Sequence, residues 1–187
     1  DDDFDSGETG AQWNVSGAGS VLNFPLLTDL SGARRQFSNL GILVSGGAEA
    51  LLPKVASLDV GFYLVRASDA GSRIDLGSVT SMANLNAELL SGGRLEIAHA
   101  TSFRQSQLRV AGTAVSIPTA QFTSITGSLI TLDGARLSFT GLQDARGTTF
   151  QTANGGQAVF PPAADLQVIA EGVETEHQYH RLIRLGC

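Results

Sequence analysis

The sequence has little charge, one cysteine and no long hydrophobic run. Charged residues make up only 16% of its 187 residues, against roughly 25% in typical domains. Cys187 is the only cysteine, so no disulfide can form within the chain and a disulfide-stapled fold is excluded. No run of about 18 apolar residues occurs, so the sequence predicts no membrane span.

The net charge of −6 is concentrated at the start of the chain. Residues 1–10, DDDFDSGETG, contain four Asp and one Glu without a basic residue, and they leave the remainder at −1. Nucleic-acid binding needs a basic stripe, so we expect no nucleic-acid partner. We interpret residues 1–16 as a solvated acidic N-terminal end. Clustered carboxylates also suit a calcium-binding loop, which is the alternative.

Stretches that favour helix are scarce, whereas glycine is abundant, with 22 residues. Seven of these glycines precede an apolar residue by three positions, and a second apolar residue follows two positions later. The gaps between successive glycines are 28, 24, 21, 20, 22 and 21 residues. The seven glycines are Gly19, Gly47, Gly71, Gly92, Gly112, Gly134 and Gly155.

Alternation of apolar and polar residues in each unit predicts short strands with one side facing inward. Proline follows the second apolar residue in four units, where it would end a strand because it lacks an N–H group. The paired apolar residues are Leu22/Phe24, Ala50/Leu52, Ile74/Leu76, Leu95/Ile97, Val115/Ile117, Leu137/Phe139 and Ala158/Phe160.

Units of about 20 to 24 residues built from strands and turns predict a mainly β, single-stranded parallel β-solenoid (β-helix) over residues 17–168. We expect about seven coils, with Leu95, Val115 and Leu137 stacked in one inward column. A leucine-rich repeat has a similar length, but it usually carries an asparagine at a fixed position, and none recurs here. A β-sandwich is the remaining alternative.

The repeat, seen in "GRLEIAHATSF", "TAVSIPTAQF" and "ARLSFTGLQD", resembles the β-helix stacks of large bacterial surface and secreted proteins. This resemblance implies an adhesin-like or structural role at the cell surface or outside the cell. It also implies neighbouring domains in a longer chain.

The last 19 residues, 169–187, depart from the repeat. Thr175 and Gln178 form a capping box, which predicts that a helix starts there. Apolar residues at helical spacing follow it, and Gly186 would end the helix. A helix whose apolar face covers the last coil is one interpretation of this segment.

The closing sequence "VIAEGVETEHQYHRLIRLGC" also resembles the late strand and helix of EAL-type cyclic-di-GMP phosphodiesterases. The resemblance implies a metal and substrate site at Glu171, a second acidic residue at Glu174, Mg or Mn as cofactor, and a cytoplasmic location. It covers only about 22 residues. That family's barrel needs eight alternating strands and helices in roughly 250 residues, which residues 17–165 do not supply.

We therefore predict a non-catalytic structural or binding module, with no catalytic, cofactor-binding or metal-ligating residue assigned. The alternatives are an inactive remnant of an EAL-type phosphodiesterase, with Glu171 and Glu174 as its site, and a carbohydrate-binding or carbohydrate-active β-helix. A cell-surface or polysaccharide ligand is the expected partner. Aromatic residues are 6% of the chain, with one Trp and two Tyr, so stacking on sugars has few candidate side chains.

Overall fold

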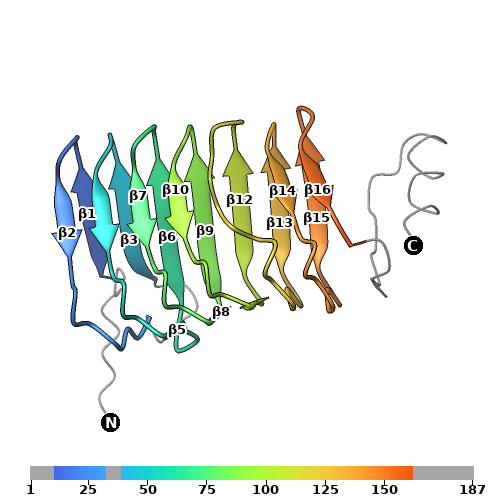
Figure 1. The fold of residues 1–187 in the computed structure, drawn as a ribbon, viewed down its shortest axis with the longest axis horizontal. Helices are drawn as coiled ribbons and strands as arrows, with labels where there is room; N and C mark the ends of the chain where they lie inside the picture. The colour runs from blue at the N-terminus through green and yellow to red at the C-terminus, as the bar shows by residue number, and fades with distance from the viewer. Residues whose placement is uncertain (1–10, 33–38, 162–187) are drawn as a thin grey trace, which may run out of the picture.

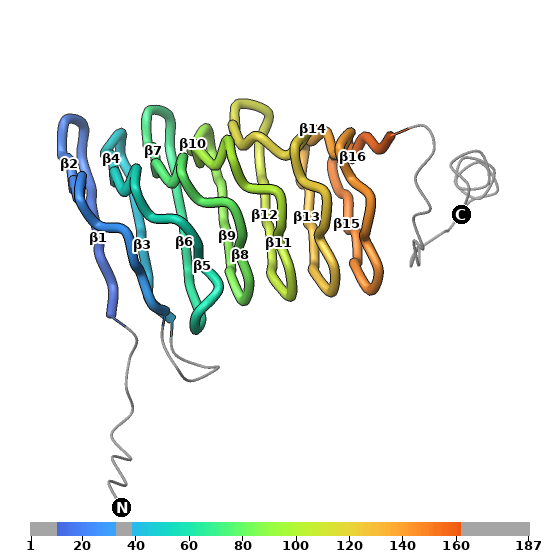
Figure 2. Tube along the Cα trace, turned by 60° about the horizontal axis from the view of Figure 1, so that its bottom comes forward, coloured from blue at the N-terminus to red at the C-terminus, as the bar shows by residue number. Residues whose placement is uncertain are grey.

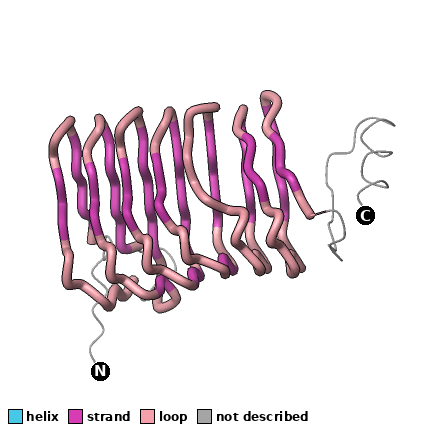
Figure 3. The backbone as a smooth tube through the Cα atoms, viewed as in Figure 1, coloured by secondary structure: helices cyan, strands magenta, loops and turns pink. Residues whose placement is uncertain are grey.

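The computed structural model describes residues 11–32 and 39–161, which form a parallel β-solenoid of about five turns. Each coil has about 22 residues. The coils lie side by side in sequence order along one axis (Figure 1), and the turned view shows each coil as a separate loop of chain (Figure 2). The described residues contain strands and turns but no helix (Figure 3). The predicted fold class is confirmed.

The longest sheet contains one strand from each of seven successive coils, all paired in parallel. Register partners lie one coil apart, as for Leu40 with Tyr63 and Leu129 with Thr149. The strands are, in spatial order, β1 (Gln12–Ser16), β3 (Leu40–Ser45), β6 (Tyr63–Ser68), β9 (Leu85–Leu90), β12 (Gln107–Ala111), β13 (Leu129–Asp133) and β15 (Thr149–Ala153).

Shorter strands form three further sheets around the stack, and each of them is also parallel. The four-stranded sheet contains β2 (Val21–Asn23), β4 (Glu49–Leu51), β7 (Arg73–Asp75) and β10 (Arg94–Glu96). The three-stranded sheet contains β5 (Ser57–Leu58), β8 (Ser81–Ala83) and β11 (Ser102–Arg104). The two-stranded sheet contains β14 (Arg136–Ser138) and β16 (Gln157–Val159).

The core lies between the sheets because alternate residues of each strand point inward. Val65 and Ala67 of β6, and Ala87 and Leu89 of β9, are fully buried, whereas the residues between them are partly exposed. Full burial of one such aliphatic side chain larger than alanine stabilises the fold by about 1.5–3 kcal/mol. The predicted inward residues that are buried are Ala50, Leu52, Ile74, Leu76, Leu95, Ile97, Leu137 and Phe139.

The number of complete turns is smaller than the number of repeat units. All seven units supply a strand to the longest sheet, but only residues 40–148 form complete turns, which number about five. The first coil includes residues outside the described range, and the last ends at residue 161. In β1, Trp13 and Val15 are only partly buried, because β1 is the end strand of its sheet and has β3 as its only neighbour there.

The predicted position of Val115 in the column is wrong. A parallel bridge joins Arg94 to Ser116, which places Ile117, and not Val115, beside Leu95. Four residues separate Ala111 from Ser116, whereas three separate Leu90 from Arg94. Gly112 also comes one residue earlier in its turn than Gly92 does. Together, the two differences move the apolar positions of this coil two residues further from the glycine.

Pro118 explains why the same coil has no strand at this level. Ser116 N–H donates to the Gly93 carbonyl, and Leu95 N–H donates to the Ser116 carbonyl. The next donor in the ladder would be residue 118, and proline has no N–H group. Thr119 follows as a buried residue, and its hydroxyl donates to the Ser138 carbonyl at 2.6 Å.

The predicted turn and helix over 169–187, including the capping box at Thr175, lie outside the described residues. The predicted acidic end shares residues 12–16 with β1 (Gln12–Ser16), and residues 1–10 lie outside the described range.

Candidate ligand-binding groove

A groove of about 660 Å³ lies at one corner of the solenoid, where the third side of each coil turns into the longest sheet. Amide side chains dominate its lining, and they come from successive coils. The amide and phenylalanine residues of the lining are Asn39, Phe62, Asn84, Asn86, Gln105 and Gln107.

The corner places one residue of each coil one or two positions before its strand in the longest sheet. Four such corner residues have a left-handed backbone, with φ of 52° at Asn84, 50° at Gln105, 65° at Gly127 and 67° at Gly147. This conformation bends the chain between a strand on one side of the coil and a strand of the longest sheet. Glycine adopts it without steric strain, whereas a residue with a Cβ adopts it at a cost.

Buried hydroxyl groups lie directly after three of the four corner residues, Gln105, Gly127 and Gly147, and hold the corner in place. Ser106, Ser128 and Thr148 are 3–4% exposed. Leu85 N–H donates to Ser106 Oγ at 3.0 Å, and Ser106 N–H donates to Ser128 Oγ at 3.2 Å. These side chains satisfy backbone donors that would otherwise be buried without an acceptor. The Asn84 and Gln105 corners are therefore firmly positioned.

A second pair of amides comes from the strands themselves. Asn86 of β9 is the register partner of Gln107 of β12. Asn86 is partly exposed and Gln107 is exposed, because both point away from the core. Each amide group offers a donor and an acceptor. Among residues 11–32 and 39–161, no hydrogen bond of these two side chains, or of Asn84 and Gln105, is present within the protein.

Phe62 and Tyr63 form the side of the groove nearest the N-terminal coils. The oxygen of the buried Tyr63 hydroxyl lies 2.7 Å from the Val60 carbonyl and 2.8 Å from the Leu30 carbonyl, so the two carbonyls share its one donated proton. Burial raises the pKa of Tyr63 above its ordinary value of 10.0. A Cβ on Gly32 would lie 2.5 Å from the Phe62 carbonyl oxygen, so the first coil packs closely against this segment.

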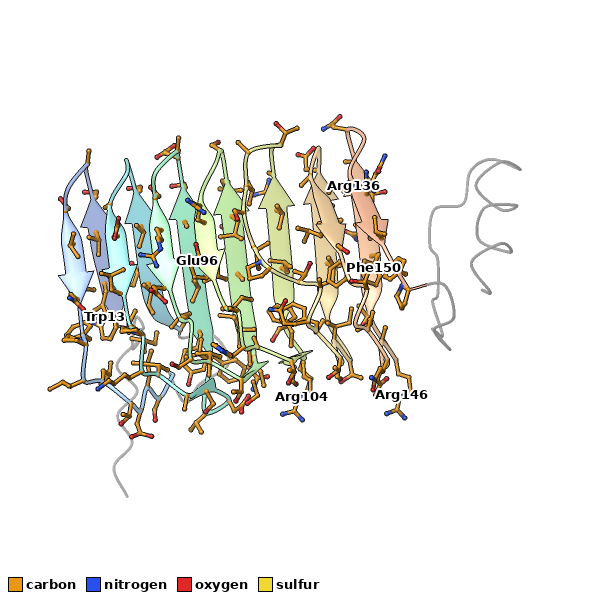
Figure 4. The ribbon with its side chains drawn as sticks, viewed as in Figure 1. Trp13, Glu96, Arg104, Arg136, Arg146 and Phe150 are labelled. Atoms are coloured by element: carbon orange, nitrogen blue, oxygen red, sulfur yellow. The ribbon has the colours of Figure 1, made fainter. Side chains whose placement is uncertain are left out.

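A smaller groove of about 450 Å³ lies on the other side of the Asn84 and Gln105 corners. Asp59 and Arg104 contribute charge to it. One oxygen of Asp59 accepts a short hydrogen bond from Ser81, and the other is buried without a partner among the described residues. Figure 4 shows Arg104 at the margin of the stack with its guanidinium directed outward.

The carboxylates of the four-stranded sheet are paired with arginine. Arg73 lies 2.8 Å from Asp75, 3.6 Å from Glu49 and 3.9 Å from Glu96. At the C-terminal coils, hydrogen bonds from Arg146 lower the pKa of Asp144. Within the described ranges, no three His, Cys, Asp or Glu side chains are grouped so that they could hold a metal ion.

The sequence-predicted candidates Glu171 and Glu174 lie outside the described residues. The groove amides were missed at the sequence level. A signal was present: Asn84-Leu85-Asn86 is followed one coil later by Gln105-Ser106-Gln107, which repeats an amide, a non-amide and an amide.

This arrangement suits hydrogen bonding to a neutral, polar ligand, because none of the described residues that line the larger groove is charged. Among the described residues, no helix is long and apolar enough to cross a membrane.

The chain matches no protein-family model, no curated protein and no solved structure. These comparisons give no support to the resemblance between residues 166–187 and EAL-type phosphodiesterases. The β-solenoid fold is shown by the structure itself.

Proposed function

We propose that this chain is a non-catalytic structural and binding module of a bacterial surface or secreted protein, and that it acts as a stiff spacer between neighbouring domains. The observation that carries the proposal is the unbroken seven-stranded parallel sheet. Every coil hydrogen-bonds through its backbone to the coil before and after it, so the separation of the two ends is fixed.

The core supports the same role. Buried aliphatic side chains continue from coil to coil, so a single coil cannot leave the stack without exposing its neighbours. Parallel strands lie about 4.8 Å apart, and six steps from β1 to β15 correspond to roughly 29 Å. A module of this kind sets a distance, and its outward side chains remain available for contacts.

The spacer function is tested by attaching a fluorescent donor and acceptor at Ser16 and Gln151, which are exposed residues of β1 and β15. Cys187 is first replaced, C187S, so that only the introduced thiols react. We expect one narrow transfer efficiency that stays constant with denaturant until the chain unfolds cooperatively. A broad distribution in buffer would contradict a stiff spacer.

Deletion of one complete coil, the 21 residues 85–105, supplies the length control, because it joins Asn84 to Ser106, the equivalent of Leu85 one coil later. The flanking coils then pair directly, and we expect the ends to approach by about 5 Å. An unchanged distance in a folded deletion variant would overturn the proposal.

Two assays test the remaining parts of the proposal. An antibody should label intact cells of the source organism or its culture medium, and labelling only after permeabilisation would contradict a surface or secreted location.

Cyclic-di-GMP incubated with the full chain and Mn²⁺ should remain intact, and turnover would contradict a non-catalytic role.

A further inference from the structure

The corner residues Asn84 and Gln105 have side chains that the fold does not require. Their φ angles are 52° and 50°, in the region where a Cβ is disfavoured. The next two coils use Gly127 and Gly147 at the same corner. Since glycine forms this corner equally well, the amide side chains stand there at a conformational cost, and strain of this kind is typical of functional positions.

The fold makes no internal use of these amides. If they formed a structural ladder, their side chains would bond to each other from coil to coil. No such bond joins Asn84 to Gln105, or Asn86 to Gln107, in the described part of the chain. Asn154 provides the contrast: it also has a positive φ, of 49°, but its amide donates to Asp133 at 2.6 Å.

The four amides form a two-by-two array. Asn84 and Asn86 come from one coil, and Gln105 and Gln107 come from the next. Coils repeat every ~4.8 Å, so donor and acceptor pairs recur along the axis of the stack. Phe62, which is half-buried in the preceding coil, supplies an aromatic surface at one end of the array.

This chemistry selects the class of ligand. Adjacent hydroxyl groups of a sugar each donate and accept, and an amide side chain can complement both roles. The apolar face of a sugar ring packs on an aromatic side chain. An anionic polymer would need cationic lining residues, and none of the described residues that line the larger groove is cationic. We propose that the groove at Asn84, Asn86, Gln105 and Gln107 binds a neutral polysaccharide chain that lies along the solenoid axis.

This inference goes beyond the spacer function, which does not depend on any ligand. Binding is measured with the full chain on a panel of neutral oligosaccharides derived from cellulose, chitin, mannan and β-1,3-glucan, followed by titration calorimetry of those that bind. We expect saturable binding of at least one neutral oligosaccharide. If none binds, or if an extended peptide or an anionic polysaccharide binds instead, the proposal fails.

The double substitution Asn84→Gly and Gln105→Gly separates binding from folding. It removes two amides and relieves the backbone at the same time, so we expect an unchanged or higher midpoint of unfolding together with at least tenfold weaker binding. A structural role for the amides would give lower stability instead. Unchanged affinity in this variant would overturn the proposal.

Asn154→Gly is the matched control. It makes the same substitution at a left-handed position that lies outside the groove, and we expect it to leave the affinity unchanged. An equal loss of affinity in this variant would show that the effect is not specific to the groove, and it would also overturn the proposal.

Discussion

The same corner of the solenoid is built in two ways, with amides at Asn84 and Gln105 and with glycine at Gly127 and Gly147. The backbone angles differ by no more than 17° across the four residues. The buried hydroxyl groups beneath both kinds of corner are also alike. The difference therefore lies in what the corner presents to solvent: the amide corners line a groove, and the larger groove does not extend to the glycine corners.

Backbone geometry and surface chemistry are therefore set separately in this fold. Hydrogen bonds between coils and inward aliphatic residues fix the backbone, so a corner residue is free to vary as long as it tolerates a positive φ. Four measurements of stability test this interpretation.

The largest effect should come from a glycine that is required by space. A Cβ on Gly93, at the turn after β9, would lie 2.1 Å from the carbonyl oxygen of Ala67. We expect Gly93→Ala to lower the free energy of unfolding by about 3 kcal/mol or more, because backbone must move. Denaturant unfolding measures this. A loss below that of Gly127→Ala would show that the packing of this turn is looser than described.

The second-largest loss of stability should come from removing the hydroxyl groups that accept hydrogen bonds at the Asn84 and Gln105 corners. Ser106→Ala removes the acceptor of Leu85 N–H, and Ser128→Ala removes that of Ser106 N–H. Each change leaves a buried donor unpaired, so we expect a loss of about 1–3 kcal/mol in both variants. Thermal and denaturant unfolding provide the measurement. A large loss in one variant only would mean that the two corners are held differently.

A smaller effect should come from Gly127→Ala. The nearest atom to an added Cβ is Gln105 Cγ at 3.6 Å, an ordinary contact, so only the positive φ opposes the change. We expect a loss of about 1 kcal/mol. Gln105→Gly should act in the opposite direction, and a matched pair of unfolding curves checks both signs. Two changes of the same sign would contradict the interpretation of the corner.

The smallest expected effect on the free energy of unfolding comes from ionisation of the Tyr63 hydroxyl, which takes place only at alkaline pH. Because burial raises its pKa above 10.0, the folded state holds the proton more tightly than the unfolded state. The associated stability is fully present below pH 10 and is lost as the pH rises through the folded-state pKa. Stability curves of the protein and of Tyr63→Phe should converge in that range. Parallel curves would show that Tyr63 does not ionise there.

Much of the fold could be predicted from the sequence because glycine spacing and period-two alternation report the same property, the length of a coil. Leu95 with Ile97 and Leu137 with Phe139 are inward residues as predicted. The prediction fails at Val115 because this turn is one residue longer than that of the preceding coil and its glycine comes one residue earlier, so the inward position moves by two residues.

The groove could not be predicted from the same signals. Its amides are polar residues on an outward side, where the repeat pattern allows many side chains. Their importance depends on the left-handed backbone at Asn84 and Gln105 and on which coils lie next to each other. Both properties follow from three-dimensional register. Glu171 and Glu174, which the resemblance suggested, lie outside the described residues and remain predictions.

The missing N–H of Pro118 has a mechanical consequence. The four-stranded sheet ends at β10, the three-stranded sheet ends at β11, and the two-stranded sheet begins only at β14. Between them, the coil at 107–128 joins its neighbours through β12 in the longest sheet and through single bridges at Ser116 and Ser124. One sheet is therefore continuous along the whole rod, whereas the strands on its other sides are interrupted at this coil. Because the ladder hydrogen bond of residue 118 is missing there, we expect the rod under load or heat to separate first at the Pro118 level.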